Sequence, residues 1–215
     1  MIVAQNNVAG AIIAGGQSSR MQAGGVPGDK FLQPLGTSSV IRHVAQRLKP
    51  QLGQLIINAN GNPLRLAALN LEVISDHPNK HGGPLPGILT ALTKAANFPW
   101  LITAAADTPF LPHDLVAQLV ERQLQTGADV VLASSANRLH PLFGLWRTSL
   151  VDRLENWLAA TDKASVLAFT SHIGFEGVDF PLATTKDGSE DYDPFFNINR
   201  PDDLVTARRL YGMIV

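Results

Sequence analysis

Arg20, Lys30 and Asp107 are the residues best suited by type and position to phosphate chemistry. An arginine can donate two parallel hydrogen bonds to phosphate oxygens, and a lysine acts as a point charge. A carboxylate at the end of an apolar run suits a Mg²⁺ ion that bridges substrate phosphates. We predict that these three residues form the catalytic group, with Asp107 as the metal ligand and Mg²⁺ as the cofactor. The competing interpretations are solvated loop charges for the two cations and a simple turn for Asp107.

A glycine-rich loop directly after an apolar run adds to this pattern. The run Val8–Ala14 carries no charge and leads into Gly15, Gly16 and a Ser/Arg segment. Backbone N–H groups in such a loop can face an anion, and glycine lets the backbone come close to it. We therefore expect the loop that starts with Gly15 and Gly16 to hold a phosphate. The spacing matches neither the Walker loop nor the dinucleotide fingerprint.

Asn58 and Asp76 each follow a further apolar run. The Asn58 amide could bond to a base or a ribose, but asparagine is also a common turn former. The Asp76 carboxylate could accept hydrogen bonds from the amino and imino groups of a base. A turn, or a salt bridge with Lys80, is the competing interpretation for Asp76.

Two features of the second half of the chain suggest a further pocket. His140 stands beside Pro141 in an irregular strand pattern, where it could line a cavity or serve only as a structural histidine. The sequence Phe195–Asn199 combines two aromatic residues with the amides of Asn197 and Asn199. It could form a buried polar bracket near the ligand, or simply pack the C-terminal region.

The elements that must position these residues alternate between apolar runs and helical patterns. Uncharged continuous runs are typical of parallel strands covered on both faces. The alternation favours an α/β fold, a three-layer α/β/α arrangement around a mostly parallel sheet, in which ligands bind at the carboxyl ends of the strands. The expected strands are 8–14, 54–58, 71–75, 100–106 and 129–133, and the expected helices are 38–48, 64–69, 87–96 and 115–125.

The remainder of the chain is less regular and reads as a cap on the same sheet. Residues 138–146 resemble a strand that Pro141 interrupts, which predicts an edge strand or a bend. We expect helices at 150–158, 164–170 and 201–211, extended pieces at 175–178 and 195–198, and a polar loop at 187–192. The prediction is a single domain, 1–215, with a nucleotide half at about 1–135 and a cap at about 136–215.

Composition excludes several classes of protein. The chain has 215 residues, of which 45% are hydrophobic and 16% charged, with 17 basic and 18 acidic residues and a net charge of −1. This balance argues against nucleic-acid partners. There is no cysteine, no signal-peptide pattern at the N-terminus and no apolar run approaching the roughly 20 residues of a membrane helix. We therefore expect a cytoplasmic protein without a membrane partner.

Taken in order, these motifs resemble the MobA family of molybdenum cofactor guanylyltransferases, whose members have a Rossmann-like nucleotidyltransferase fold. The first is the loop from Ile13 to Met21, followed by Asp29-Lys30. The resemblance extends over nearly the whole chain. The other matching motifs are Ile56–Asn60, Val73–Asp76, Gly83–Ile88, Asp107–Phe110, His140-Pro141 and Phe196–Leu204.

The resemblance implies a reaction in which GTP and molybdenum-bound molybdopterin give the guanine dinucleotide cofactor and pyrophosphate. It assigns Ile13, Ala14, Gly15 and Lys30 to GTP, and Asp107 to both GTP and Mg²⁺. It assigns Asn58 and Asp76 to the nucleotide, and His140, Asn197 and Asn199 to the pterin side. It implies as protein partners the upstream cofactor-synthesis proteins and the apo-molybdoenzymes or their chaperones.

Two departures from the family pattern stand out. The segment Gln22–Gly28 is several residues longer than the family's compact turn before the aspartate and lysine, and by itself it reads as a surface loop. Pro86 stands where the family usually has a small alanine. The alternatives are a transferase of the same fold that uses CTP or acts on a sugar or isoprenoid phosphate, and a non-catalytic nucleotide-binding adaptor. A nicotinamide oxidoreductase is more remote because the dinucleotide fingerprint is absent.

Overall fold

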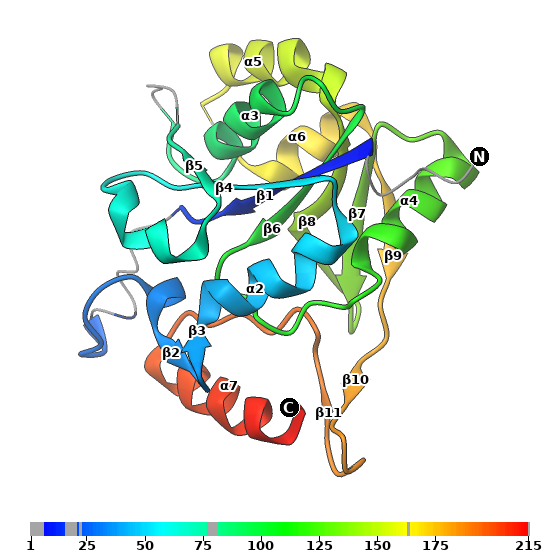
Figure 1. Ribbon diagram of the computed structural model, residues 1–215. Coiled ribbons are helices and arrows are strands. Elements are labelled where there is room, and N and C mark those ends of the chain that lie inside the picture. The colour runs from blue at the N-terminus through cyan, green and yellow to red at the C-terminus, as the bar shows by residue number, and fades with distance from the viewer. Residues whose placement is uncertain (1–6, 16–20, 22, 77–80, 163, 215) are drawn as a thin grey trace.

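A seven-stranded sheet forms the centre of the protein in the computed structural model, which describes residues 7–15, 21, 23–76, 81–162 and 164–214. The strand order is β5-β4-β1-β6-β8-β7-β9 (Figure 1). All neighbouring strands are parallel except β8, which runs antiparallel to both β6 and β7. The strands are β1 (Val8–Ile13), β4 (Gln54–Asn58), β5 (Glu72–Ile74), β6 (Trp100–Ala105), β7 (Val130–Ser135), β8 (Arg138–Arg147) and β9 (Glu176–Asp179).

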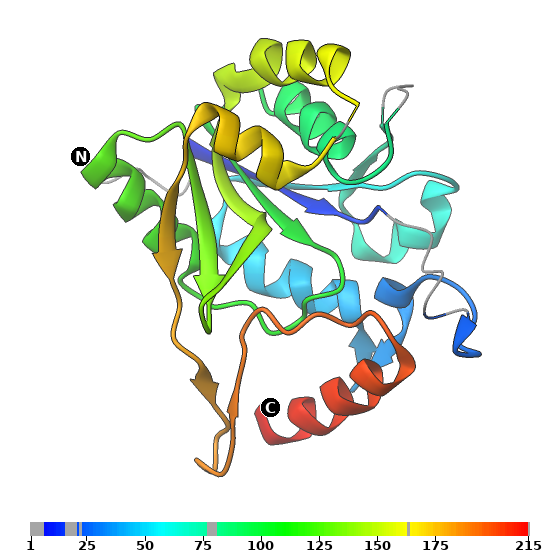
Figure 2. The ribbon, with the colours of Figure 1, turned by 180° about the vertical axis from the view of Figure 1, so that it is seen from behind.

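Helices cover both faces of this sheet, which confirms the predicted three-layer α/β fold (Figures 1 and 2). One face packs against α2 (Val40–Leu48) and α4 (Leu115–Thr126). The other face packs against α3 (Leu85–Lys94), α5 (Val151–Ala160) and α6 (Val166–Ile173).

Successive residues of β1 are divided between the two layers. Val8 and Ile12 belong to one core cluster, and Ala9, Ala11 and Ile13 to the other. Side chains alternate across a strand, so a strand buried on both faces must be apolar at nearly every position. This is why β1 and β6 read as uninterrupted apolar runs in the sequence.

The C-terminal helix α7 (Pro201–Ile214) lies outside these layers, in the lower part of both views. It packs in a third cluster through Leu204, Ala207 and Leu210, together with Met21 and Phe110. Two small antiparallel pairs lie near it: β2 (Pro34–Leu35) with β3 (Ser38–Ser39), and β10 (Ala183–Thr184) with β11 (Asp191–Tyr192). The 3₁₀ segments are η2 (Lys30–Leu32), η3 (Lys49–Gln51), η4 (Pro63–Leu69) and η5 (Thr148–Leu150).

Strand β8 is an interior strand, so the prediction that it lies at an edge is wrong, and the alternative of a bend is right. Its pairing with β7 shifts register between Leu132, which faces Gly144, and Ala133, which faces His140. The residues between Gly144 and His140, Pro141 among them, are thereby left out of this ladder. A proline has no N–H to donate, and a bulge is where an interior strand can accommodate it.

Two further expectations are corrected. The polar loop expected at 187–192 ends in β11, which closes a short hairpin with β10. The segment Phe195–Ile198 lies outside the strands of the described chain, because its backbone bonds elsewhere: Ile198 N donates to the Asp107 carbonyl at 3.0 Å and Phe196 N to the Asp193 carbonyl at 3.0 Å. Over the described ranges, no helix has the length and apolar character needed to cross a bilayer.

Candidate nucleotide site

The carboxyl ends of four parallel strands meet along one edge of the sheet. Ile13 of β1 is in register with Asn58 of β4 on one side and Ala105 of β6 on the other. Backbone bonds continue this alignment past the strand ends, from Ala14 N to the Asn58 carbonyl at 2.8 Å and from Ala106 N to the Ile13 carbonyl at 3.2 Å. The residues that follow each strand therefore form one continuous polar row.

At one position in this row, Lys30, Asp107 and Asn199 come together from distant parts of the sequence. The Lys30 ammonium forms an ion pair with Oδ2 of Asp107 and donates a hydrogen bond to Oδ1 of Asn199 at 2.6 Å. The side chains of Lys30 and Asp107 are only 18% and 9% exposed. The structure thus places three of the predicted site residues in direct contact, Lys30 and Asp107 of the predicted catalytic group and Asn199 of the predicted bracket.

This cluster lines a cavity of about 340 Å³. Ile13 and Gly15 at the end of β1 line it, which agrees with the predicted role of the first loop. The other lining residues are Lys30, Phe31, Gly83, Pro84, Ala105, Ala106, Asp107, Leu142, Asn197 and Asn199.

The segment after β6, which carries Asp107, is held in place by a side chain of α2. α4 begins at Leu115 with Asp114 as its N-cap residue, so Asp107 is not a helix cap. The Arg47 guanidinium of α2 donates to the Leu111 carbonyl at 2.7 Å, and burial lowers the pKa of Arg47. This partly buried cation holds the segment by bonding to its carbonyl groups.

Asn58 and Asp76 form a second cluster further along the edge, at the ends of β4 and β5. Asp76 Oδ1 accepts from Asn58 Nδ2 at 2.9 Å, and Oδ2 accepts from Asn60 Nδ2 at 2.9 Å. Asp76 N donates to Asn60 Oδ1 at 3.0 Å. The carboxylate plane is therefore fixed, while each oxygen keeps a further lone pair for a donor on a ligand.

The start of α3 closes against this second cluster through Gly87. A Cβ atom at Gly87 would lie 2.2 Å from Asn58 Oδ1 and 3.3 Å from Asp76 Oδ1. Only glycine allows this approach. Gly83 precedes it with φ of +87°, a left-handed conformation that suits glycine.

A larger cavity of about 590 Å³ adjoins the first on the far side of β6. The two cavities share five lining residues, Pro84, Ala105, Leu142, Asn197 and Asn199. His140 lines the larger cavity, and its ring stacks on Phe195 with centroids 4.6 Å apart. The predicted pocket around His140, Asn197 and Asn199 therefore exists.

A buried hydrogen-bond chain holds His140. Its Nε2 lies 2.7 Å from Ser135 Oγ, which donates to Asp193 Oδ1 at 2.7 Å. Burial lowers the pKa of His140; the nearby Asp193 opposes this shift and Arg138 adds to it. The imidazole is thus disposed to remain neutral and to keep one ring nitrogen as a donor to Ser135.

Asn199 is positioned by the first turn of α7. Oδ2 of Asp203 accepts from Asn199 N at 2.9 Å and from Arg200 N at 2.8 Å. Asn199 Nδ2 in turn donates to Asn197 Oδ1. A carboxylate near a helix N-terminus satisfies free N–H groups there, and in this case it also orients the bracket.

Two predicted residues, Gly16 and Arg20, lie outside the described residues. Within the described ranges, no three His, Asp or Glu side chains come together as a ready-made metal site. The donor chemistry at Asp107 still fits Mg²⁺, because Mg²⁺ commonly takes one or two carboxylates and completes its shell with phosphate oxygens and water. Asp107 would be its protein ligand.

Ser135, Asp193 and Arg65 are not among the residues predicted from the sequence. Ser135 bonds to Asp193, 58 positions away, and Arg65 to Asp29, 36 positions away, so no local pattern pairs them. Asp203, by contrast, lies within the motif Phe196–Leu204, four positions from Asn199. Asn60 had a recognisable signal, since it follows Asn58 at the spacing that returns a side chain to the same side of an extended chain.

Comparisons with known proteins show the family to which the chain belongs. The family described as MobA-like NTP transferase domain matches residues 10–173. The molybdenum cofactor guanylyltransferase of Brucella ovis is 56% identical over 203 residues, which cover 94% of this chain and 92% of that protein.

Two solved structures share the fold at low identity. Molybdopterin-guanine dinucleotide biosynthesis protein A from Archaeoglobus fulgidus has a TM-score of 0.71 at 23% identity, covering 95% of this chain and 98% of that chain. The 4-diphosphocytidyl-2C-methyl-D-erythritolsynthase of Anaerococcus prevotii has a TM-score of 0.72 at 9% identity, covering 98% of each chain. Together with the family match and the Brucella relative, these likenesses lead to one conclusion: the chain belongs to the MobA-like NTP transferase family and is a nucleotidyltransferase.

Proposed function

We propose that this protein transfers the GMP moiety of GTP to molybdenum-bound molybdopterin and releases pyrophosphate, forming the molybdopterin guanine dinucleotide cofactor. One observation carries the proposal. The Asp76 cluster, the Lys30–Asp107–Asn199 cluster and the 590 Å³ cavity follow one another along a single sheet edge. The Brucella ovis relative, 56% identical, is a molybdenum cofactor guanylyltransferase, which supports the same reaction.

In this proposal each cluster binds a different part of GTP. The Asp76 carboxylate, held by Asn58 and Asn60, would accept from the amino and imino groups of guanine. The loop after β1 and Lys30 would bind the triphosphate, with Arg20 as a second cation. The pterin would occupy the larger cavity, near His140, Asn197 and Asn199.

The proposed reaction is an attack by one charged phosphate on another. The terminal phosphate of the pterin attacks the α-phosphorus of GTP in line, a new P–O bond forms, and the bond to the β-phosphate oxygen breaks with its electron pair leaving on pyrophosphate. The attacking phosphate is already ionised near pH 7, so no general base is needed. Catalysis is then positioning and charge neutralisation.

Each residue of the site has a defined task in this scheme. Lys30 would exchange its contact with Asp107 for phosphate oxygens, and Asn199 would keep the ammonium directed into the cavity. Asp107, released from Lys30, would hold Mg²⁺. When bound, Mg²⁺ supplies charge compensation at the phosphate oxygens.

The test is a pyrophosphate-release assay with GTP, Mg²⁺ and molybdenum-loaded molybdopterin, with CTP and ATP as comparison nucleotides. Release with GTP alone among the three supports the proposal. Release with CTP in preference to GTP points to the cytidylyl alternative. Nucleotide binding without release under any condition overturns the transfer reaction and leaves a binding protein.

The proposed partners follow from the same scheme. They are GTP, molybdenum-bound molybdopterin, the proteins that make that pterin, and the apo-molybdoenzymes or chaperones that receive the product. Retention of the protein on an immobilised upstream or downstream partner, measured with and without GTP, checks this part separately.

A further inference from the structure

We propose that Arg65 is a positioning residue that joins the base side of the site to the phosphate side and thereby strengthens selection of guanine. This inference rests on the proposed function, since it assigns the base to Asp76 and the phosphates to Lys30. Arg65 lies on η4, between the two clusters, and it was not among the predicted site residues.

On the phosphate side, Arg65 contacts the neighbours of Lys30 on both sides. Its Nη1 forms an ion pair with Oδ2 of Asp29. Its guanidinium lies 5.6 Å from the centroid of the Phe31 ring, and Phe31 is buried at 2% exposure. One arginine therefore contacts the residue before Lys30 and the residue after it, and so restricts the backbone that carries Lys30.

On the base side, the same guanidinium holds the residue that orients Asp76. Nη2 of Arg65 donates to the Asn60 carbonyl at 2.5 Å. The Asn60 side chain bonds both to Oδ2 and to the backbone N of Asp76, at 2.9 and 3.0 Å. A continuous chain of contacts thus runs from Asp29 through Arg65 and Asn60 to Asp76.

Arginine suits this task because its planar guanidinium directs rigid donors in different directions. Nη1 donates to Asp29 and Nη2 donates to Asn60, while Cζ lies over the Phe31 ring. A lysine has one nitrogen at the end of a flexible chain and cannot hold the same three partners in one rigid geometry.

The segment that presents Arg65 is itself fixed. Asn62 caps η4 by accepting from Leu64 N at 3.0 Å, and Leu66, next to Arg65, is 1% exposed. The Arg65 side chain is 30% exposed, so the ion pair alone would add little to stability. We infer instead that Arg65 fixes two ligand-binding groups, Lys30 and Asp76, relative to each other before the ligand binds.

The experiment uses calorimetric titration of the full-length protein with GTP, and with inosine triphosphate, which lacks the exocyclic amino group of guanine. Pyrophosphate release with the pterin acceptor then gives KM and kcat. The variants are Arg65→Ala and Arg65→Lys. The matched control is Arg147→Ala, since Arg147 also combines an ion pair, with Asp129, and a ring contact, 4.6 Å from the Trp100 centroid, and lies at the opposite sheet edge.

We expect Arg65→Ala to weaken GTP binding about tenfold, the scale of one charge-assisted hydrogen bond, and to raise KM by a similar factor while kcat changes less than about twofold. The preference for GTP over inosine triphosphate should fall, because Asp76 is no longer held to meet the amino group. Arg65→Lys should recover part of the affinity through Asp29 but not the preference. Arg147→Ala should match the wild type in all four quantities.

An unchanged preference in Arg65→Ala overturns the inference, as does a loss confined to kcat. If Arg65→Ala does not fold by circular dichroism, an unchanged preference in Arg65→Lys overturns it instead. Failure of the proposed function shows separately, in the wild type: either GTP is bound no better than CTP, or no pyrophosphate is released with the pterin acceptor.

Discussion

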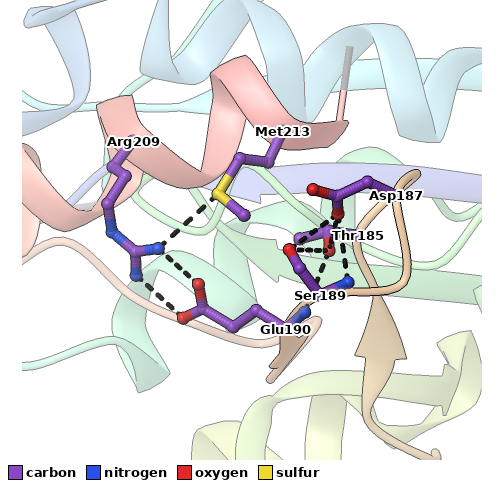
Figure 3. Close-up of polar contacts among 6 residues, drawn as sticks. All are labelled: Thr185, Asp187, Ser189, Glu190, Arg209 and Met213. Atoms are coloured by element: carbon purple, nitrogen blue, oxygen red, sulfur yellow. Dashed lines mark hydrogen bonds and ion pairs between the residues drawn. The ribbon is translucent and has the colours of Figure 1, made fainter.

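Two regions of this protein are dense in polar contacts, and they differ in where their partners come from. In the hairpin of β10 and β11, Asp187 accepts from Thr185 Oγ1 at 2.7 Å and from Ser189 Oγ at 2.7 Å, all within one turn (Figure 3). Beside it, Glu190 accepts a fork of two bonds from Arg209 of α7. At the sheet edge, by contrast, Lys30 bonds to Asn199, which is 169 positions away in the chain.

The contacts in the hairpin also shift the pKa values of two of its carboxylates. Hydrogen bonds from Ser189 and Thr185 lower the pKa of Asp187 to about 2. The Arg209 guanidinium lowers the pKa of Glu190. Yet these groups satisfy one another on the surface, whereas Lys30, Asp107 and Asn199 line a cavity. We therefore identify the site by residues that come from distant parts of the chain and line one cavity. A shifted pKa alone only raises the probability that a residue belongs to a functional site.

The largest expected effect comes from removing the cavity carboxylate. Asp107→Ala should lower turnover by at least about a hundredfold, because the proposed ligand of the Mg²⁺ ion that compensates charge at the phosphates is lost. The pyrophosphate assay measures this, and Asp187→Ala is the control with near wild-type turnover. A reversed ranking of these two variants would break the comparison between the regions.

A second expected effect comes from Gly87. Gly87→Ala should weaken GTP binding and destabilise the fold by about 1–3 kcal/mol, because its Cβ would lie 2.2 Å from Asn58 Oδ1. Titration with GTP and urea unfolding measure the two effects. Gly82→Ala, where a Cβ would meet nothing within 4 Å, should behave as the wild type.

His140 should make stability depend on pH in a defined direction. Burial lowers its pKa, so the unfolded chain binds the proton more readily than the folded one. Its contribution is therefore fully present above the unfolded pKa of about 6.5 and is lost as the pH falls below that value. The melting-temperature gap between wild type and His140→Gln should shrink from pH 7.5 to 5.5, and a gap that widens would contradict this.

The smallest effect is expected in the hairpin, and it disappears in acid. Asp187 has a folded pKa of about 2 against an ordinary value of 3.8, so its contribution is present above pH 4 and is lost as the pH falls toward 2. Asp187→Asn should melt slightly below the wild type at pH 7 and together with it near pH 2. Its GTP binding at pH 7 should be unchanged, which would sharpen the contrast with the sheet edge.

Most of the residues at the sheet edge could be predicted because parallel strands form a pattern that is visible in the sequence. Each apolar run ends at a polar or glycine residue, and parallel topology brings those ends together, as it does for Gly15, Asn58 and Asp107. Lys30 lies on η2 and not at a strand end, so its contact with Asp107 becomes visible only in the folded chain.

The rest depended on choices of partner that no local pattern encodes. The interior position of β8 is set by pairing with β6 and β7, whereas the proline within it suggested an edge. Arg65 looks like any charged residue on a short helix until its guanidinium is seen between Asp29 and Asn60. Hydrogen-bond chains such as the one from Asp193 to His140 likewise become visible only in three dimensions.

The bulge in β8 has a consequence for how the chain can change its length. Leu142 and its neighbours form a cavity wall, although they belong to a strand held between two others. Beyond the bulge, Trp146 donates from Nε1 to the buried Thr103 Oγ1 at 2.9 Å. A residue inserted or deleted within the strand would turn every later side chain to the opposite face and remove that indole from its partner. The largely exposed segment 23–28 has no such register to lose, so insertions and deletions can alter the Lys30 side of the site far more readily than the His140 side.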